Sequence, residues 1–168
     1  LDAKYTGLTT KQKIQSVRDY LKEKKADVLL LSCLDEIAWL YNIRGKDIPY
    51  NPVVISYALV SAERAWLFVK PAKIPAEVKQ ALEEAGVEIR DYHHLFLFLE
   101  EWKDKKKFCL DTSTLNFAVY NKIAASHEII TGRSPVVLWK ALKNPTEIAG
   151  FRKACQQDGI AMTRFFYW

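Results

Sequence analysis

The 168-residue sequence is poor in cysteine and histidine, with three of each. Cys33, Cys109 and Cys155 are odd in number and widely spaced, which argues against a disulfide framework or a zinc site. We therefore expect a reducing, cytoplasmic compartment. The sequence also lacks an apolar run long enough to cross a bilayer and a secretory signal at its start, so we expect no membrane association.

The histidines form no metal-binding pattern. His93 and His94 are adjacent, so they cannot share one face of a helix or strand. His127 is expected to open a strand, and we expect all three histidines to be surface or helix-end polar groups. Because HExxH and clustered Asp-x-Asp patterns are also missing, the sequence predicts no metal site within this chain.

Phosphate-binding loops and activated nucleophiles are missing as well. Neither GxxxxGK[ST] nor GxGxxG occurs. Cys33 follows an apolar run and precedes a predicted helix, a position that lowers the pKa of a thiol. However, Asp35 and Glu36 follow it and would repel phosphate, and no base lies nearby in the sequence. We therefore expect a structural thiol and no catalytic residue in this chain.

Charge of one sign is not concentrated in any segment. The net charge of +5 suggests nucleic-acid binding at first sight. Basic and acidic residues nevertheless alternate, as in KQKIQSVRDYLKEKK (11–25) and EEWKDKKK (100–107). Interleaved charge is typical of a solvated surface, so we expect no nucleic-acid binding.

What the sequence does contain is an alternation of helix and strand patterns. Apolar spacing, caps and breakers predict helices over about 10–25, 33–41 (with Ser32 as its cap), 74–86, 93–105, 115–126 and from 144 onward. Apolar and β-rich runs predict strands over 26–32, 53–61, 64–70, 87–92, 107–111 and 127–131, with a hairpin at Ala62-Glu63. This order predicts an α/β fold: a mixed, mostly parallel sheet with one antiparallel hairpin and helices on both faces.

The chain also suggests two parts. Residues 1–143 hold all the predicted strands, and Asn144-Pro145 opens a long helix that forms the second part, 144–168. The chain begins at Leu1, not Met, and its last helix has no cap before Trp168. We therefore expect a piece of a longer protein.

One stretch, LDEIAWLYNIRGKDIPYNPV (34–53), is unlike a plain helix or loop. It places charged and polar residues on a short helix and a proline-bounded loop after a buried strand. Open α/β sheets carry functional loops at that end of their strands. Two interpretations remain open: a shaped functional loop, or a connection whose charges solvate it and whose Trp39 fills the core.

The same stretch carries a family resemblance. LDEIAWLYNIRGKDIPYNPVVISYALV (34–60) closely resembles the segment that marks the amino-terminal region of three-domain Xaa-Pro aminopeptidases, which are creatinase/prolidase-like "pita-bread" metallopeptidases. RAWLFVK (64–70), LLLSCLDEIAW (29–39) and KNPTEIAGFRKACQQDGIAM (143–162) are similar to that family too. The resemblance spans most of 26–168. It implies a creatinase amino-terminal, ribonuclease-H-like fold and the second of three domains.

The resemblance also implies an activity that lies outside this chain. Such enzymes remove an N-terminal residue when proline comes next, using two metal ions, usually Mn²⁺. The ligands are two Asp, one His and two Glu of a carboxyl-terminal pita-bread domain, and none of those motifs occurs here. The implied role is therefore non-catalytic, with no cofactor of its own. The implied partners are that catalytic domain, a proline-containing peptide and a second subunit of a homodimer.

The resemblance suggests specific residues as well. Arg44 and Asp47 are expected to face the substrate cleft or the catalytic domain, Gly45 to permit a turn, and Trp39 to anchor the short helix. The full set of cleft or domain-interface candidates is Asp35, Arg44, Asp47, Tyr50 and Asn51, and the structural motif positions are Trp39, Gly45 and Pro52. Two rival functions stay open: a free-standing interaction or ligand-binding module of the same fold, and a nucleotide- or nucleic-acid-binding α/β domain.

Overall fold

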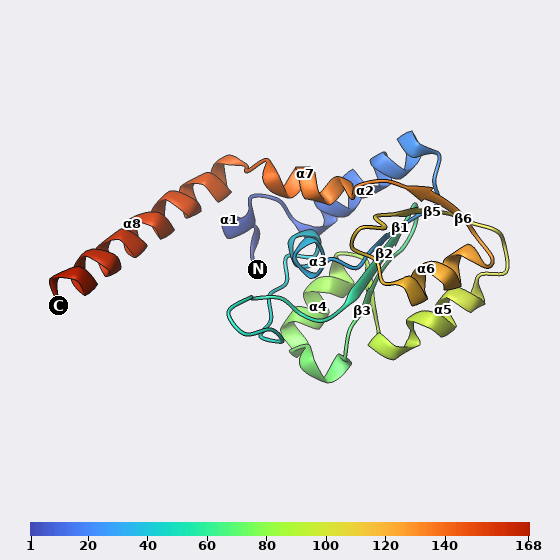
Figure 1. Ribbon diagram of the computed structural model, residues 1–168, viewed down its shortest axis with the longest axis horizontal. Helices are drawn as coiled ribbons and strands as arrows, with labels where there is room; N and C mark the ends of the chain where they lie inside the picture. Colours follow the sequence, from blue (N-terminus) through green and yellow to red (C-terminus); the bar gives the residue numbers. More distant parts are fainter.

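Six strands form one mixed sheet at the centre of the computed structural model, which describes residues 1–168 (Figure 1). Their spatial order is β4-β3-β2-β1-β5-β6. β2 is antiparallel to both β1 and β3, and all other neighbouring strands are parallel. The prediction of a mostly parallel mixed sheet with one hairpin is confirmed. The strands are β1 Val28–Leu31, β2 Tyr57–Ser61, β3 Ala65–Phe68, β4 Val87–Arg90, β5 Lys107–Leu110 and β6 Glu128–Thr131.

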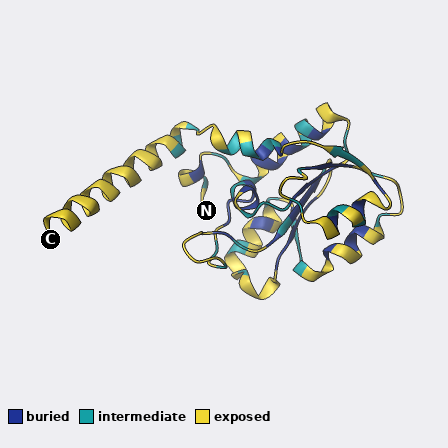
Figure 2. Cartoon of the chain, viewed as in Figure 1, coloured by how far each residue is buried: buried dark blue, intermediate teal, exposed yellow.

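Helices cover both faces of this sheet. Side chains alternate across each strand, so Leu29 and Leu31 pack on one face while Val28 and Leu30 pack on the other. The first face is covered by α2 Thr10–Lys24, α3 Leu34–Leu40, α4 Ala76–Glu84 and α7 Pro135–Ala141. The second is covered by α5 Leu95–Glu101 and α6 Phe117–Ala124. The buried residues therefore form two apolar layers, one on each side of the sheet (Figure 2).

The long helix α8, Pro145–Tyr167, leaves this body and has no buried residue (Figures 1 and 2). Asn144 is its N-cap and Pro145 its first residue, as predicted. The remaining short elements are α1 Ala3–Thr6 and the 3₁₀ turns η1 Pro71–Lys73 and η2 Tyr92–His94. None of the helices combines the length and the apolar character that a bilayer crossing requires.

Several local predictions were wrong. α3 begins after Cys33 with no side-chain cap, because the hydroxyl of Ser32 instead donates to the carbonyl of Thr114 at 3.1 Å. β2 begins at Tyr57, four residues later than predicted, and α7 was not predicted at all. His127 is buried and not on the surface: its ring lies 5.0 Å from that of Phe108, and its Nδ1 accepts from an amide at 3.3 Å.

Candidate domain interface

The loop between α3 and β2, residues 43–56, is a narrow projection that we call the rim loop (Figure 1). Its two legs run antiparallel. The amide of Gly45 donates to the carbonyl of Pro52, and the amide of Asp47 donates to that of Val53, both at 3.3 Å. At the tip, the amide of Asn51 donates to the carbonyl of Ile48 at 3.2 Å. The loop is therefore held along its length, although it belongs to no helix or strand.

Gly45 is required by the closeness of the two legs. A Cβ atom at this position would lie 2.2 Å from Val54 Cγ2 and 3.0 Å from the carbonyl oxygen of Val53. Such distances are far inside van der Waals contact, and Val54 is a stiff β-branched residue. Gly45 does not have a positive φ angle. Glycine is therefore required at this position because it lacks a side chain, and not because of its backbone flexibility.

Asp47 binds the rim loop to the rest of the domain. Its Oδ2 accepts from the amide of Ile55 at 2.9 Å and lies 2.8 Å from the ammonium of Lys73 in η1. The hydrogen bond from Lys73 and that from Ile55 lower the pKa of Asp47. The carboxylate is 13% exposed. Contact of this residue with a substrate or another domain stays a prediction.

Arg44 also makes contacts within the domain. Its Nη1 donates to the carbonyls of Ala38 at 2.9 Å and Ile43 at 2.7 Å. One of these carbonyls lies in the last turn of α3 and also accepts from the amide of Ile43 at 3.1 Å, so Arg44 adds a second bond at the carboxyl end of the helix. The residue as a whole remains exposed, so the guanidinium is both a local cap and part of the surface.

The tip of the rim loop presents Tyr50 to solvent. Its side chain is fully exposed, and its φ of 63° lies in the left-handed region. For a residue with a Cβ this conformation costs roughly 1–2 kcal/mol. Pro49, Asn51 and Pro52 beside it are exposed too. An exposed aromatic ring on a strained, well-held tip is typical of a contact surface.

The structure places Asp35 away from the rim loop. It lies in the first turn of α3 and forms an ion pair with Lys140 of α7. The thiol of Cys33 donates to Asp35 Oδ1 at 3.0 Å. Burial raises the pKa of Asp35, but the hydrogen bonds from Lys140 and Cys33 outweigh it and the net pKa is lowered. Burial and the Asp35 hydrogen bond raise the pKa of Cys33 to about 12, so this thiol is not an activated nucleophile.

Trp39 and Glu36 occupy two other faces of α3. The indole N–H of Trp39 donates to Glu147 Oε1 in the first turn of α8 at 3.4 Å, so Trp39 anchors α8 as well as its own helix. Glu36 is 2% exposed, and its Oε2 has no hydrogen-bond partner. Burial raises the pKa of Glu36. Its neighbours Asp35 and Lys140 act in opposite directions on that pKa.

Sequence reasoning missed Lys13, which is 1% exposed beneath Trp39. Its ammonium donates to the carbonyl of Trp39 at 2.8 Å and to Asn42 Oδ1 at 2.7 Å. The signal was present, because Lys13 shares a helical face with Ile14, Val17 and other buried residues of α2. A basic residue on an apolar face is easily assigned to the surface when only the net charge pattern is considered.

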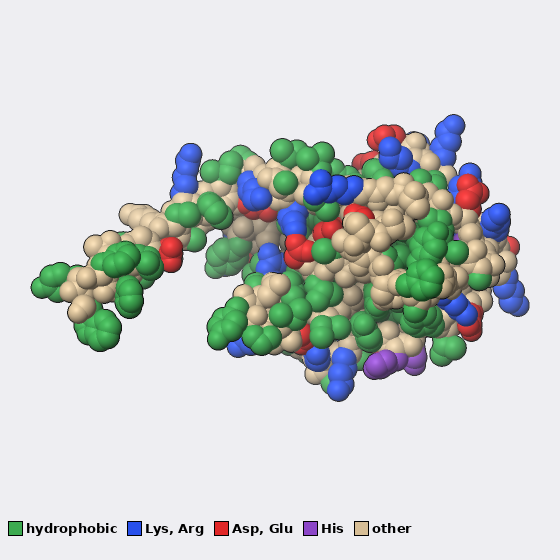
Figure 3. Space-filling model, in the orientation of Figure 1, with side chains coloured by type: hydrophobic (Ala, Val, Ile, Leu, Met, Phe, Trp, Pro, Cys, Tyr) green, Lys and Arg blue, Asp and Glu red, His purple; other side chains and the backbone are tan.

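α8 carries an apolar stripe that nothing in this chain covers. At 100° per residue, one side of the helix gathers Ile148, Phe151, Cys155, Met162 and Phe166. Phe151 is 67% and Phe166 77% exposed. Figure 3 shows hydrophobic side chains along the projecting helix and at its far end. A continuous stripe of this kind is typical of a surface that another element covers.

No three or more His, Cys, Asp or Glu side chains are arranged to hold a metal ion. The residues present therefore do not fit a dinuclear centre, and the site consists of the rim loop and α8. The structure brings Arg44, Asp47, Tyr50 and Asn51 into one loop, with Trp39 at the adjoining helix, and leaves Asp35 beside α7. This arrangement is suited to contact another domain or molecule.

Known proteins resemble this chain over its whole length. Residues 1–147 match the family described as the creatinase/prolidase N-terminal domain. A probable Xaa-Pro aminopeptidase P of Sordaria macrospora is 40% identical over 177 residues, which cover 100% of this chain and 29% of that protein. Xaa-Pro aminopeptidase 1 of Dictyostelium discoideum is 37% identical and is covered to 26%. The chain thus spans less than a third of the curated relatives it matches.

Solved structures agree with this similarity. An X-prolyl aminopeptidase from Caenorhabditis elegans, described as a cytosolic enzyme with a di-nuclear active site, superimposes with a TM-score of 0.92 at 32% identity. The match covers 100% of this chain and 28% of that one. The prolidase of Pyrococcus horikoshii, with a TM-score of 0.65 at 18% identity, shares the fold.

Proposed function

Because this chain belongs to the creatinase/prolidase N-terminal domain family, we propose that it is a non-catalytic domain of an Xaa-Pro aminopeptidase. The parent enzyme removes the N-terminal residue from peptides with proline in second position. Catalysis resides in a pita-bread domain that follows α8 and holds two metal ions, which we propose to be Mn²⁺. We propose that the ligands of both metal ions lie in that following domain.

The observation that carries this proposal is the uncovered stripe of α8. A helix of 23 residues without one buried side chain buries too little apolar surface to be stable through its own contacts. The relatives are three to four times as long as this chain, as the 26–29% coverage implies. A following domain of the same polypeptide, packed on Phe151, Met162 and Phe166, therefore accounts for the stripe.

We further propose that the rim loop walls the entrance of the active site. Its legs are held by Asp47 and Gly45, so the tip carries little conformational freedom to lose on contact with a peptide. Tyr50 supplies apolar area there, and Arg44 supplies a positive charge for a peptide carboxylate or an acidic neighbour. The wall belongs to the same subunit or to its partner in a homodimer, in a cytoplasmic protein like the cytosolic enzyme of Caenorhabditis elegans.

The test is to replace Tyr50 by Ala in the full-length enzyme and to measure kcat and KM for Xaa-Pro peptides of increasing length. We expect kcat/KM for the longer peptides to fall roughly five- to thirty-fold, which corresponds to one or two kcal/mol of lost contact. Tyr50 contacts nothing in its own domain, so the fold should not change. Tyr5→Ala is the matched control, because Tyr5 is also exposed but lies on α1. If Tyr50→Ala and Arg44→Ala both leave kcat and KM unaltered at every length, the loop does not wall the site.

A further inference from the structure

The first turn of α8 is fastened to two other helices, α1 and α3, by side-chain hydrogen bonds. Asn144 caps α8, and its Nδ2 also donates to the carbonyl of Thr6 in α1 at 2.8 Å. This approach needs Gly7: a Cβ there would lie 2.4 Å from Asn144 Oδ1, and its φ of 71° disfavours other residues. Glu147 completes the capping box by accepting from the amide of Asn144 at 3.0 Å. The amino-terminal end of α8 is thus held by hydrogen bonds, and its carboxyl-terminal end projects from the domain.

Glu147 also connects α8 to a buried positive charge. Its Oε1 accepts from the indole N–H of Trp39. The ammonium of Lys13 lies 4.0 Å from the ring of the same Trp39, within the range of a cation–π interaction. A cation above the ring polarises the indole and strengthens its N–H as a donor to the carboxylate. The order of groups is therefore a cation, an aromatic ring and an anion, from α2, α3 and α8.

Lys13 is unusual because no carboxylate neutralises it directly. Its ammonium is buried and contacts only the carbonyl of Trp39, Asn42 Oδ1 and the Trp39 ring. Burying a lysine charge is unfavourable, and a methionine would fill the same apolar space. The buried ammonium of Lys13 therefore has a role other than filling apolar space.

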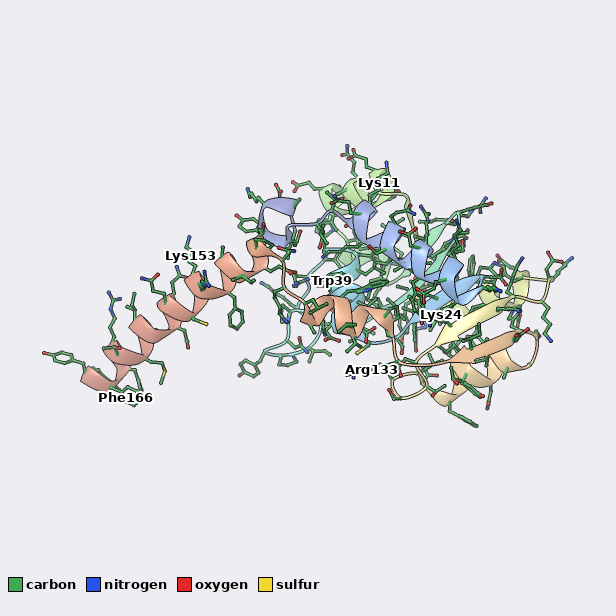
Figure 4. The ribbon with its side chains drawn as sticks, turned by 90° about the horizontal axis from the view of Figure 1, so that it is seen from above. Lys11, Lys24, Trp39, Arg133, Lys153 and Phe166 are labelled. Carbon is green, nitrogen blue, oxygen red and sulfur yellow. The ribbon has the colours of Figure 1, made fainter.

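We propose that Lys13, Trp39 and Glu147 form a lock that sets the direction in which α8 leaves the domain. Lys13 is then a positioning residue: through Trp39 it places the polypeptide that follows Trp168 relative to the rim loop. Figure 4 shows Trp39 within the body, and Lys153 and Phe166 on the projecting part of α8. Only the consequence for peptidase activity rests on the proposed function, because the helix direction is a property of this chain.

The length of α8 makes its direction important. At 1.5 Å per residue its 23 residues extend about 35 Å, so a tilt of about 10° at the first turn moves the far end by about 6 Å. A displacement of this size at an active-site wall would be far above the ~1 Å that can change a rate by about a hundredfold. A small change at Lys13 is therefore expected to have a large effect at a distance.

The experiment measures the distance between spin labels on α2 and α8 in the full-length protein. Labels at position 22 and position 153 are both on exposed lysines of this chain. Cys33, Cys155 and other accessible cysteines are replaced by Ser. Lys13→Met removes the ammonium, Trp39→Phe removes the indole N–H, and Lys11→Met is the control, since Lys11 is exposed on the same helix. We expect the first two variants to shift or broaden the distance by several ångströms, and the control to match the wild type.

The outcomes separate the lock from the proposed function. A folded Lys13→Met protein with the wild-type distance would overturn the lock, whether or not the parent is a peptidase. If Lys13→Met changes the distance but the wild-type protein cleaves no Xaa-Pro peptide, the lock stands and the proposed function is rejected. If Lys13→Met does not fold, Glu147→Gln decides, because glutamine still caps the amide of Asn144 but carries no charge. An unchanged distance in that variant together with Trp39→Phe would also reject the lock.

Discussion

The rim loop and α8 leave the same domain but are held in opposite ways. The rim loop is bonded along both legs, whereas α8 is fastened only at its first turn and has no buried residue along its length. The loop therefore has a defined position in this chain alone. The far end of α8 depends on an angle at one end and on whatever covers its stripe. The irregular rim loop is thus held in position more firmly than the far end of the regular helix α8.

Among the substitutions considered, Gly45→Ala should lower the stability of the domain most, because a methyl group there would force apart the legs of the rim loop. We expect the free energy of unfolding to fall by about 1–3 kcal/mol, the usual result of adding a methyl group to a tightly packed site. Urea unfolding would measure it. Gly132→Ala is the control, since no atom lies within 4 Å of a Cβ at Gly132. Equal stability of the two variants would show that the legs separate freely.

Lys13 should make the stability of the domain depend on alkaline pH. Burial lowers the pKa of Lys13 to about 8, Glu147 opposes this change, and Arg44 adds to it. The unfolded chain, with a lysine pKa near 10.5, binds more protons between these values, so wild-type stability should rise with pH across that window. Relative to Lys13→Met, the gain should be on the order of 1–2 kcal/mol after allowance for solvent screening.

Urea unfolding of both proteins at pH 7, 8.5 and 10 would measure this gain, because the other titrating groups cancel in the difference. A stability difference that stays constant from pH 7 to 10 would mean that Lys13 keeps an ordinary pKa in the folded protein.

Asp47→Asn should have a smaller effect, of about 1 kcal/mol or less, because the ion pair with Lys73 is partly exposed. The pKa of Asp47 is lowered in the folded protein, so the carboxylate stabilises the fold above its unfolded pKa near 3.9 and loses this contribution as the pH falls through the folded pKa. The stability difference between wild type and variant should therefore disappear in acid. Thermal unfolding at pH 7 and pH 2.5 would check it, and a difference that persisted in acid would contradict it.

Phe151→Ala should have the smallest effect in this chain, within about 0.5 kcal/mol, because the side chain is largely exposed here. In the full-length protein the same substitution should cost several times more, since the proposed catalytic domain covers the stripe. Denaturation of both forms would give the two values. Similar small values in both would show that nothing packs on α8.

Much of the fold follows from local patterns. The helix from Thr10, the cap at Asn144 and the six strands were predictable because each depends on neighbours within a few residues. The first part of the rim loop was also located correctly, whereas its last residues, 53–56, were assigned to a strand that begins only at Tyr57. Its internal contacts were not predictable, since the partner of Asp47 is Lys73, twenty-six positions away, and that of Gly45 is Val54. Errors at Ser32 and His127 have the same cause.

The sequence by itself determined the alternating α/β order, the family resemblance and the start of α8, because capping, apolar spacing and motif composition are properties of contiguous residues. Tertiary structure decided what the inward-turning charged residues contact. Lys13 became buried because α2 packs against α3, and Asp47 became a tether because η1 comes beside the rim loop. Tyr50 stayed outside because the legs beneath it close on each other. Such choices depend on contacts between distant segments, which exist only once the sheet has brought those segments together.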